Sequence, residues 1–238
     1  MGDNLKAIRA KNVSYRYPDG TVGVLNVSLE IEVGERVGIV GANGSGKSTL
    51  LFLLAGLLPP ERGEVEILGM RVEKKNFERI RRSIGIAFQN PDDFLFNPSV
   101  RDELLYVPLQ LGWDEKRIED ALRRYSELFS IQNILQKPPF RLSGGEKKKV
   151  EIASILIYEP EVLLLDEPTA NVDGKSKRVI MRLLEDFKGT LVIASHETEV
   201  IKALCNRVVL MNTNHTIEAD GGAELLDDTE LMEKIGVF

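Results

Sequence analysis

Hydrophobic and polar residues alternate along the first third of the chain with the period of β-strands. Between residues 98 and 136 the apolar positions change to helical spacing, and Pro138 and Pro139 end this block. Strand and helix patterns then alternate towards the C-terminus. The predicted strands cover residues 7–10, 24–33, 36–40, 64–68, 83–88, 162–165, 190–194 and 207–211, and the later helices cover 144–158, 175–187 and 228–235.

This order of elements predicts an α/β fold. Strands that alternate with helices form a largely parallel sheet with helices on both faces. The helical block at about 90–158 is then an insertion between two parts of the core, residues 1–88 and 159–238. We expect the whole chain, residues 1–238, to form a single domain of this kind.

Composition predicts a soluble, cytosolic protein that does not bind nucleic acid. The chain has 238 residues, of which 43% are hydrophobic and 29% charged, as in globular proteins. Its longest apolar stretch, residues 50–58, is far shorter than the roughly 20 residues that span a bilayer. The single cysteine, Cys205, is expected to be a small buried apolar side chain. A net charge of −6 argues against nucleic acid as the partner.

The sequence GANGSGKST at residues 41–49 fits the phosphate-binding pattern G-x-x-x-x-G-K-[ST]. A predicted strand precedes it and an apolar helix is predicted at 48–55, as this motif requires. Backbone N–H groups of such a loop, and the helix N-terminus, attract a phosphate. Lys47 is expected to neutralise the terminal phosphates and Ser48 to hold Mg²⁺. The other loop residues expected to contact the nucleotide are Gly41, Asn43, Gly44, Ser45, Gly46 and Thr49.

Two acidic residues follow the aliphatic run at 162–165. A carboxylate at the C-terminal end of a buried parallel strand lies at the edge of the sheet where ligands bind. Asp166 is expected to bind Mg²⁺, and Glu167 to stand beside the terminal phosphate and polarise the attacking water.

The sequence LSGGE at residues 142–146 identifies a family. Together with the phosphate loop and the DEPT sequence at 166–169, it resembles the ATP-binding subunit of ABC transporters over nearly the whole chain. The resemblance implies a P-loop ABC ATPase fold, with an N-terminal antiparallel β-subdomain and a helical insertion. It also implies ATP hydrolysis with Mg²⁺ as cofactor.

The resemblance extends to further site residues. Tyr17 matches the aromatic residue that stacks on adenine, with Tyr15 as the weaker candidate. Gln89 matches the glutamine that senses Mg²⁺ and the γ-phosphate, and His196 matches the switch histidine on the γ-phosphate. Residues 170–173 match the loop that crosses to a partner subunit.

In this family two subunits enclose two ATP molecules head to tail. By resemblance, Ser143, Gly144 and Gly145 of one chain face the nucleotide that Lys47 of the other chain holds. The partner is a second ATPase subunit, either an identical copy or a paralogue, and both possibilities stay open.

One stretch is similar to a subgroup of the family. The sequence FQNPDDFLF at residues 88–96 resembles that of ATPases in energy-coupling-factor importers of cobalt, nickel and vitamins. The partners implied are a transmembrane coupling protein and a substrate-binding membrane protein, so the subunit would work at the cytoplasmic face of the membrane. Phe94, Leu95 and Phe96 are candidates for a docking surface, although they could instead pack inside the fold.

Other interpretations remain at this point. The chain could be the ATPase of another ABC transporter class, a non-transport ABC ATPase, or a scaffold that binds ATP without hydrolysing it. No long heptad run of the kind found in DNA-repair relatives is present. Lys47, Asp166, Glu167 and His196 are all present, which argues against an inactive scaffold. The lysine run at 147–149 is expected to be a solvated helix face.

Overall fold

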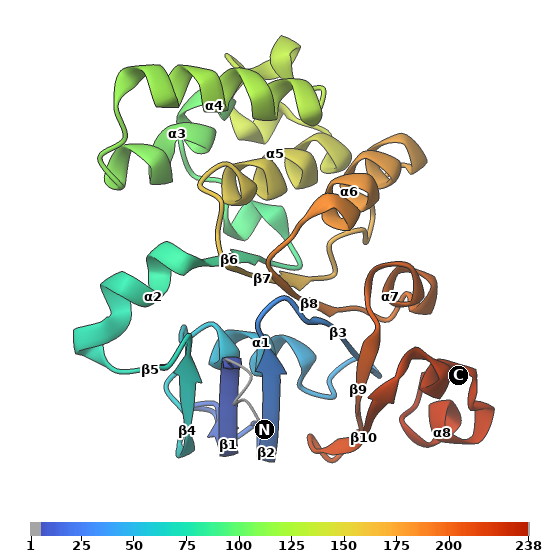
Figure 1. Cartoon of the computed structure of the whole chain (residues 1–238). Coiled ribbons are helices and arrows are strands. Elements are labelled where there is room, and N and C mark those ends of the chain that lie inside the picture. Colours follow the sequence, from blue (N-terminus) through green and yellow to red (C-terminus); the bar gives the residue numbers. More distant parts are fainter. Residues whose placement is uncertain (1–5, 238) are drawn as a thin grey trace. The chain divides into compact units, whose positions relative to one another are not determined.

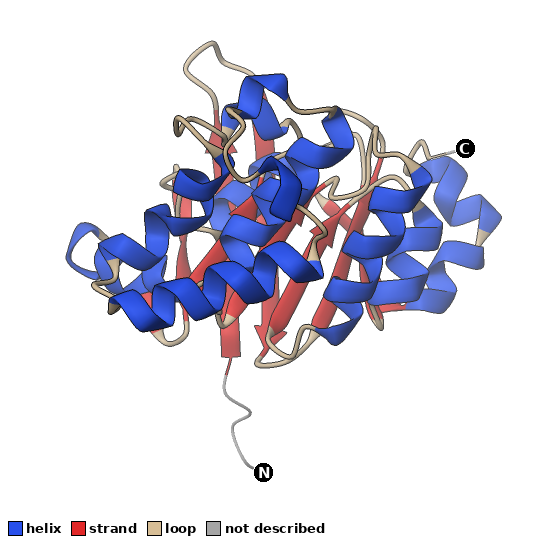
Figure 2. Cartoon of the chain, turned by 90° about the horizontal axis from the view of Figure 1, so that it is seen from above, coloured by secondary structure: helices blue, strands red, loops and turns tan. Residues whose placement is uncertain are grey.

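The structure is a computed structural model that describes residues 6–237. It contains two compact units. Of the described residues, the first, here called the sheet unit, includes 6–84, 161–166 and 188–237. The second, here called the helical unit, includes residues 85–160 and 167–187. Most strands belong to the sheet unit and the long helices to the helical unit (Figure 1), and Figure 2 colours all strands red and all helices blue.

An antiparallel sheet forms one part of the sheet unit. Its strands lie side by side in the order β2-β1-β4-β5 (Figure 1). Ala10 of β1 pairs with Leu29 of β2 on one side and with Val65 of β4 on the other, and all three side chains are buried. Cross-strand apolar pairs of this kind fix the register of a sheet. The strands are β1 (Lys6–Arg16), β2 (Val22–Glu32), β4 (Arg62–Ile67) and β5 (Met70–Arg71).

A mostly parallel sheet forms the other part, in the order β10-β9-β3-β8-β7. Every residue of β7 and β8 is buried, which accounts for their unbroken aliphatic sequences. The strands are β3 (Arg36–Gly41), β7 (Val162–Asp166), β8 (Thr190–Ala194), β9 (Arg207–Met211) and the antiparallel edge strand β10 (Ile217–Gly222).

Short helices complete the sheet unit. They are α1 (Lys47–Leu54), α2 (Phe77–Ser83), α7 (Thr198–Leu204) and α8 (Thr229–Lys234), with 3₁₀ turns η1 (Lys74–Asn76) and η5 (Ala223–Asp227). Helix α1 buries most of its residues, and α7 buries Val200, Ile201 and Leu204. These helices therefore supply the apolar cover that a parallel sheet needs.

The chain enters the helical unit within β6 (Ile84–Ala87). In this unit, helices α3 and α6 pack against α5, and α4 packs against α3 (Figure 1). Phe129 and Leu104 are fully buried and mark its core. The elements are η2 (Pro91–Asp93), α3 (Val100–Gln110), α4 (Glu115–Leu128), η3 (Gln132–Ile134), η4 (Pro139–Arg141), α5 (Gly144–Leu156) and α6 (Gly174–Asp186).

The predicted fold class is confirmed, with a mostly parallel sheet, an antiparallel sheet and a set of helices. The boundaries were less accurate, since the strand predicted at 7–10 extends from Lys6 to Arg16. Cys205 is buried as expected, and burial raises the pKa of its thiol to about 12. The assignment of the whole chain to one domain stays a prediction.

Candidate functional site

The phosphate loop joins β3 to α1 in the sheet unit. Gly46 is the N-cap of α1, and its backbone is left-handed with φ of 98°. A Cβ atom at this position would lie 2.1 Å from the carbonyl oxygen of Gly23 in β2, so the loop fits against β2 only with glycine here. No acidic residue occupies the first turn of α1. The helix N-terminus is therefore free of competing carboxylates and suited to an anion.

Lys47 is folded back over this loop. Its Nζ donates to the carbonyl oxygen of Gly41 at 2.8 Å and to that of Ala42 at 2.9 Å. The residue is only 7% exposed. A buried ammonium that is held by neutral carbonyl groups is placed to attract a phosphate.

The hydroxyl of Ser45 is buried, and no described residue forms a hydrogen bond with it. By contrast, Asn43 and Gly44 at the top of the loop are exposed. The loop therefore has a buried hydroxyl group on its inner side and solvent-accessible backbone at its top.

The strand ends beside this loop carry the other predicted groups of the sheet unit. Asp166 ends β7 and pairs in register with Ala194, which ends β8 and in turn pairs with Ile39 of β3. His196 follows two residues after Ala194 and is exposed, whereas Asp166 is 2% exposed. The sheet therefore brings Asp166, His196 and the phosphate loop to one edge, at the C-terminal ends of three adjacent strands.

Tyr17 lies against the start of α1. Its hydroxyl is 2.9 Å from Oγ1 of Thr49, and its ring packs edge-on against the ring of Tyr15 with centroids 5.1 Å apart. The aromatic ring predicted to stack on adenine is thus attached to the phosphate loop by a side-chain hydrogen bond.

The C-terminal segment also contacts the loop. The N–H of Ala42 donates to the carbonyl oxygen of Ile235 at 3.3 Å, just after α8. Ile235 and Met232 are fully buried, which anchors this segment. Sequence reasoning missed this contact, because no local motif links residues so far apart in the chain.

The helical unit carries the LSGGE sequence at the start of α5. Ser143 is the N-cap, and its Oγ accepts from the N–H of Glu146 while the Glu146 carboxylate accepts from the N–H of Ser143. This reciprocal pair is a capping box. The hydrogen bond from the Ser143 N–H is the main cause that lowers the pKa of Glu146.

Gly145 is a close-contact position. A Cβ atom there would lie 2.4 Å from Oδ2 of Asp173 and 2.8 Å from Oγ of Ser176. Asp173 caps α6, since its Oδ1 accepts from the N–H groups of Lys175 and Ser176 at 3.0 Å each. Gly145 therefore lets the start of α5 approach the capped end of α6.

Two further predicted residues belong to the helical unit. Glu167 is 4% exposed and has a left-handed backbone with φ of 48°. Such a conformation is uncommon for a residue with a Cβ atom and often marks a functional position. Gln89 is exposed. The structure thus groups Gln89, Ser143, Gly144, Gly145 and Glu167 in the helical unit, and the roles of all these residues towards a nucleotide stay predictions.

The lysine run after LSGGE is not a solvated face. Lys148 is 1% exposed, and its Nζ lies 2.9 Å from Oε2 of the fully buried Glu151. The prediction was wrong because acidic and basic residues three positions apart can pair inside a helix interface. The three-residue spacing of Lys148 and Glu151, within a run of apolar residues, was the sequence signal that could have indicated this ion pair.

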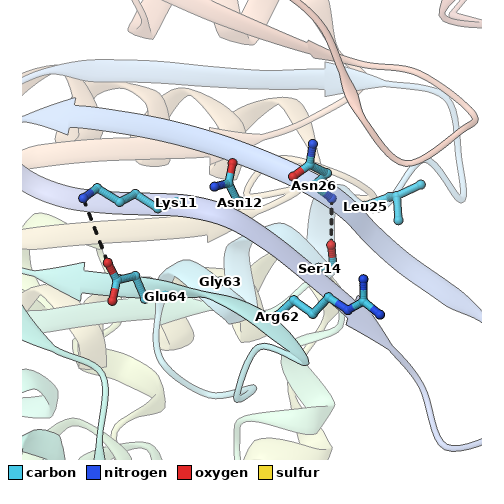
Figure 3. A pocket seen from close by; sticks show the side chains of 8 residues that line it. All are labelled: Lys11, Asn12, Ser14, Leu25, Asn26, Arg62, Gly63 and Glu64. Atoms are coloured by element: carbon cyan, nitrogen blue, oxygen red, sulfur yellow. Dashed lines mark hydrogen bonds and ion pairs between the residues drawn. The ribbon is translucent and has the colours of Figure 1, made fainter.

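A separate hollow of about 750 Å³ lies on β1, β2 and β4 (Figure 3). Ser14 accepts there from the N–H of Asn26 at 2.9 Å, and Lys11 pairs with Glu64 at 4.0 Å. None of the sequence-predicted site residues lines it. Because these polar groups already bind one another, we interpret the hollow as an ordinary surface depression.

Residues 24–170 match the family model described as ABC transporter. The chain belongs to the family of ABC transporter ATP-binding subunits. A putative ABC transporter ATP-binding protein of Archaeoglobus fulgidus is 66% identical over 238 residues, the whole of both chains. The energy-coupling factor transporter ATP-binding protein EcfA of Methanothermobacter thermautotrophicus is 40% identical over 232 residues, which are 95% of this chain and 75% of that protein.

Solved structures agree with this assignment. The structure of cbiO1 from Clostridium perfringens, described as part of the ABC transporter complex cbiONQ, has a TM-score of 0.80 at 31% identity and covers 98% of this chain and 95% of that one. A dimeric ATP-binding cassette in a post-hydrolysis state with ADP and Pi has a TM-score of 0.81 at 28% identity, over 91% of this chain and 98% of that one.

As an ABC transporter subunit, the chain binds ATP and hydrolyses it to ADP and phosphate. The residues that carry the phosphate loop and LSGGE lie within the matched range. Within residues 6–237, no helix is long and apolar enough to cross a membrane.

Proposed function

We propose that this subunit is the motor of an ABC importer of the energy-coupling-factor group, and that it drives uptake of a micronutrient such as cobalt, nickel or a vitamin. The observation that carries the proposal is the exposed side chain of Phe96, in the stretch that resembles this group. Phe96 is 68% exposed and packs edge-on against Tyr106 with ring centroids 5.2 Å apart. The relatives EcfA and cbiO1 support the same group.

In this proposal the sheet unit holds the nucleotide. Tyr17 stacks on adenine, the loop from Gly41 to Thr49 surrounds the phosphates, and Lys47 offsets their charge. The donor set also fits Mg²⁺, which binds proteins through one or two carboxylates and takes further ligands from substrate phosphates. Ser48 and Asp166 would hold it, one through its hydroxyl and the other through its carboxylate. When bound, Mg²⁺ offsets charge that develops on the phosphates.

Hydrolysis requires a water molecule to be oriented and deprotonated. Glu167 serves as general base in the proposal, and the residue is buried, with 4% exposed. His196 and Gln89 contact the γ-phosphate side of the site. Loss of a general base costs about 10²- to 10⁴-fold in rate.

Two subunits complete the site. Ser143, Gly144 and Gly145 of one chain face the phosphates held by Lys47 of the other, and two-fold symmetry makes both sites equivalent. Ser143, the N-cap of α5, is exposed, while Glu146 in the first turn already occupies the N–H group of Ser143.

Light scattering on Glu167→Gln tests this arrangement. We expect the variant to bind ATP, to lose turnover, and to change from monomer to dimer when Mg-ATP is added. Lys47→Ala is the control, because it removes phosphate binding and should stay monomeric. Normal turnover of Glu167→Gln would overturn the role of Glu167, and ATP binding without a mass change would indicate a paralogous partner subunit.

The membrane partner is tested separately. Phe96, together with Phe94 and Leu95, is proposed to receive an apolar helix of a transmembrane coupling protein, which would place the subunit at the cytoplasmic face of the membrane. Asp92 is already paired with Lys147 at 2.6 Å, so Asp93 is the acidic residue left to attract a basic residue of that helix.

We expect Phe96→Glu to abolish co-purification with the membrane proteins and to leave ATP binding unchanged. Leu128→Glu is the matched control, since Leu128 is an exposed apolar residue of α4 in the same unit. Co-purification of Phe96→Glu at the wild-type level would contradict the docking proposal, whatever the transported substrate.

A further inference from the structure

Helix α5 contains a buried ion pair one turn after LSGGE. Nζ of Lys148 lies 2.9 Å from Oε2 of Glu151, and their side chains are 2% and 0% exposed. Burying two charges costs desolvation free energy that a pair of apolar side chains would not cost. A pair kept under these conditions is a candidate for a role beyond packing.

The pair holds the backbone of the segment that carries Gln89. Oε1 of Glu151 accepts from the N–H of Phe88 at 2.8 Å. Nζ of Lys148 donates to the carbonyl oxygen of Phe88 at 2.7 Å and to that of Gln89 at 3.2 Å. Three backbone groups of two adjacent residues are thus bound by two side chains, while the side chain of Gln89 is exposed.

The same helix begins at Ser143, so one rigid element carries both features. Lys148 and Glu151 lie within about two turns of the capping box at the start of α5. Phe88 and Gln89 follow β6, more than 50 residues earlier in the chain. Charged hydrogen bonds to backbone groups are shorter and stronger than neutral ones, and they restrict the geometry of what they bind.

We propose that Lys148 and Glu151 are positioning residues that fix the backbone of Gln89 to the helix that begins with Ser143. Neither side chain touches the nucleotide. The pair keeps the Gln89 side chain and the LSGGE sequence in one spatial relation, so that Gln89 reaches the ATP of its own subunit when LSGGE reaches the ATP held by the partner subunit. The inference rests on the proposed role of Gln89 in sensing the γ-phosphate.

The test compares ATP binding and ATP hydrolysis between wild type and the double variant Lys148→Met/Glu151→Leu. This variant keeps the side-chain volume and leaves no unpaired charge. We expect its Kd for a fluorescent ATP analogue to stay within about twofold of wild type. Its kcat for ATP hydrolysis should fall by about 10- to 100-fold, as a misplacement of about 1 Å at a catalytic group does. The single variant Lys148→Arg keeps the donors and should retain most of the activity.

Lys147→Met is the matched control. Lys147 lies on the same helix and forms a surface ion pair with Asp92, in which its side chain is 17% exposed. Loss of this ion pair should change kcat by less than about twofold, because ion pairs near the surface contribute little. The melting temperature of each variant checks that it folds.

Combination with Gln89→Ala separates positioning from packing. If the pair acts through Gln89, the double variant should lower kcat no further in a Gln89→Ala background, because coupled residues are non-additive. Additive losses, or an unchanged kcat in the double variant, would overturn the inference. An unchanged kcat in Gln89→Ala alone would instead overturn the proposed role of Gln89.

Discussion

The hydroxyl of Tyr17 lies 2.9 Å from the Oγ1 of Thr49, although the two residues are 32 positions apart in the chain. Thr49 is the last residue of the phosphate loop and lies in the first turn of α1. The two ends of the expected nucleotide site, one for the base and one for the phosphates, are therefore joined directly.

Tyr17→Ala should weaken ATP binding, because it removes the ring that stacks on adenine. Base stacking on an aromatic residue contributes about 1–3 kcal/mol, so Kd should rise by about 5- to 150-fold. Tyr17→Phe keeps the ring and loses only the hydrogen bond to Thr49, so its Kd should rise by less than about fivefold. Calorimetric titration with ATP measures both. A larger effect of Tyr15→Ala would reassign the stacking to Tyr15.

Gly145→Ala should lower the melting temperature, and Gly144→Ala should not. The added methyl group at residue 145 would collide with Asp173 and Ser176, and Asp173 is needed to cap α6. At residue 144 the nearest heavy atom is the carbonyl oxygen of Asn171 at 3.7 Å, an ordinary contact. Loss of a helix cap costs about 1 kcal/mol, and thermal unfolding of the two variants measures it. Equal melting temperatures would show that Asp173 moves aside without loss.

The backbone conformation of Glu167 predicts an unusual order of stability among its variants. With φ of 48°, alanine carries the cost of a left-handed conformation, about 1 kcal/mol, and glycine does not. Glu167→Gly should therefore be more stable than Glu167→Ala by about that amount, although both lack the general base. Urea unfolding of the two variants decides this, and a more stable alanine variant would contradict it.

Glu103 makes stability depend on pH. The residue is 3% exposed, and burial is the main cause that raises the pKa of its carboxyl group. The folded state thus binds this proton more tightly than the unfolded state does, so the group's contribution to stability falls as pH rises from the unfolded pKa through the raised folded pKa. One carboxylate oxygen accepts from the N–H groups of Phe96 and Asn97, and a glutamine oxygen can replace it there.

Glu103→Gln should therefore be more stable than wild type at neutral pH, and the difference should shrink at about pH 4, where the wild-type carboxyl is protonated. Glu103→Ala should be less stable at both values by about 1–3 kcal/mol, because it leaves two backbone N–H groups without their acceptor. Chemical denaturation at the two pH values measures the free energy of unfolding of each variant relative to wild type. A stability gain of Glu103→Gln that grows on acidification would contradict the prediction.

Much of the fold follows from local patterns in the sequence. The strands β7 and β8 were predicted within one residue, because a strand buried on both faces needs an unbroken aliphatic run. The strand β10 and the helix α7 were missed. The edge strand β10 has the sequence IEADGG, without alternation, and forms because it pairs with β9.

Sequence motifs also located the phosphate loop and LSGGE, since their chemistry depends on adjacent residues. Contacts between distant residues were not visible in this way. The burial of Lys148 depends on backbone groups about 60 positions away, and the close approach of Gly145 to Asp173 depends on how α5 meets α6. Tertiary structure decides such contacts, and the three-residue spacing of Lys148 and Glu151 indicates only that these two side chains can pair with each other.

The hydrogen bond between Ala42 and Ile235 has a practical consequence for biochemical work on this subunit. An affinity tag or fluorescent fusion joined shortly after Ile235 would begin just beyond the carbonyl group that accepts a hydrogen bond from the phosphate loop. Such an addition can alter nucleotide affinity without touching the nucleotide. Measured affinities should therefore be compared between tagged and cleaved protein before any is assigned to the native subunit.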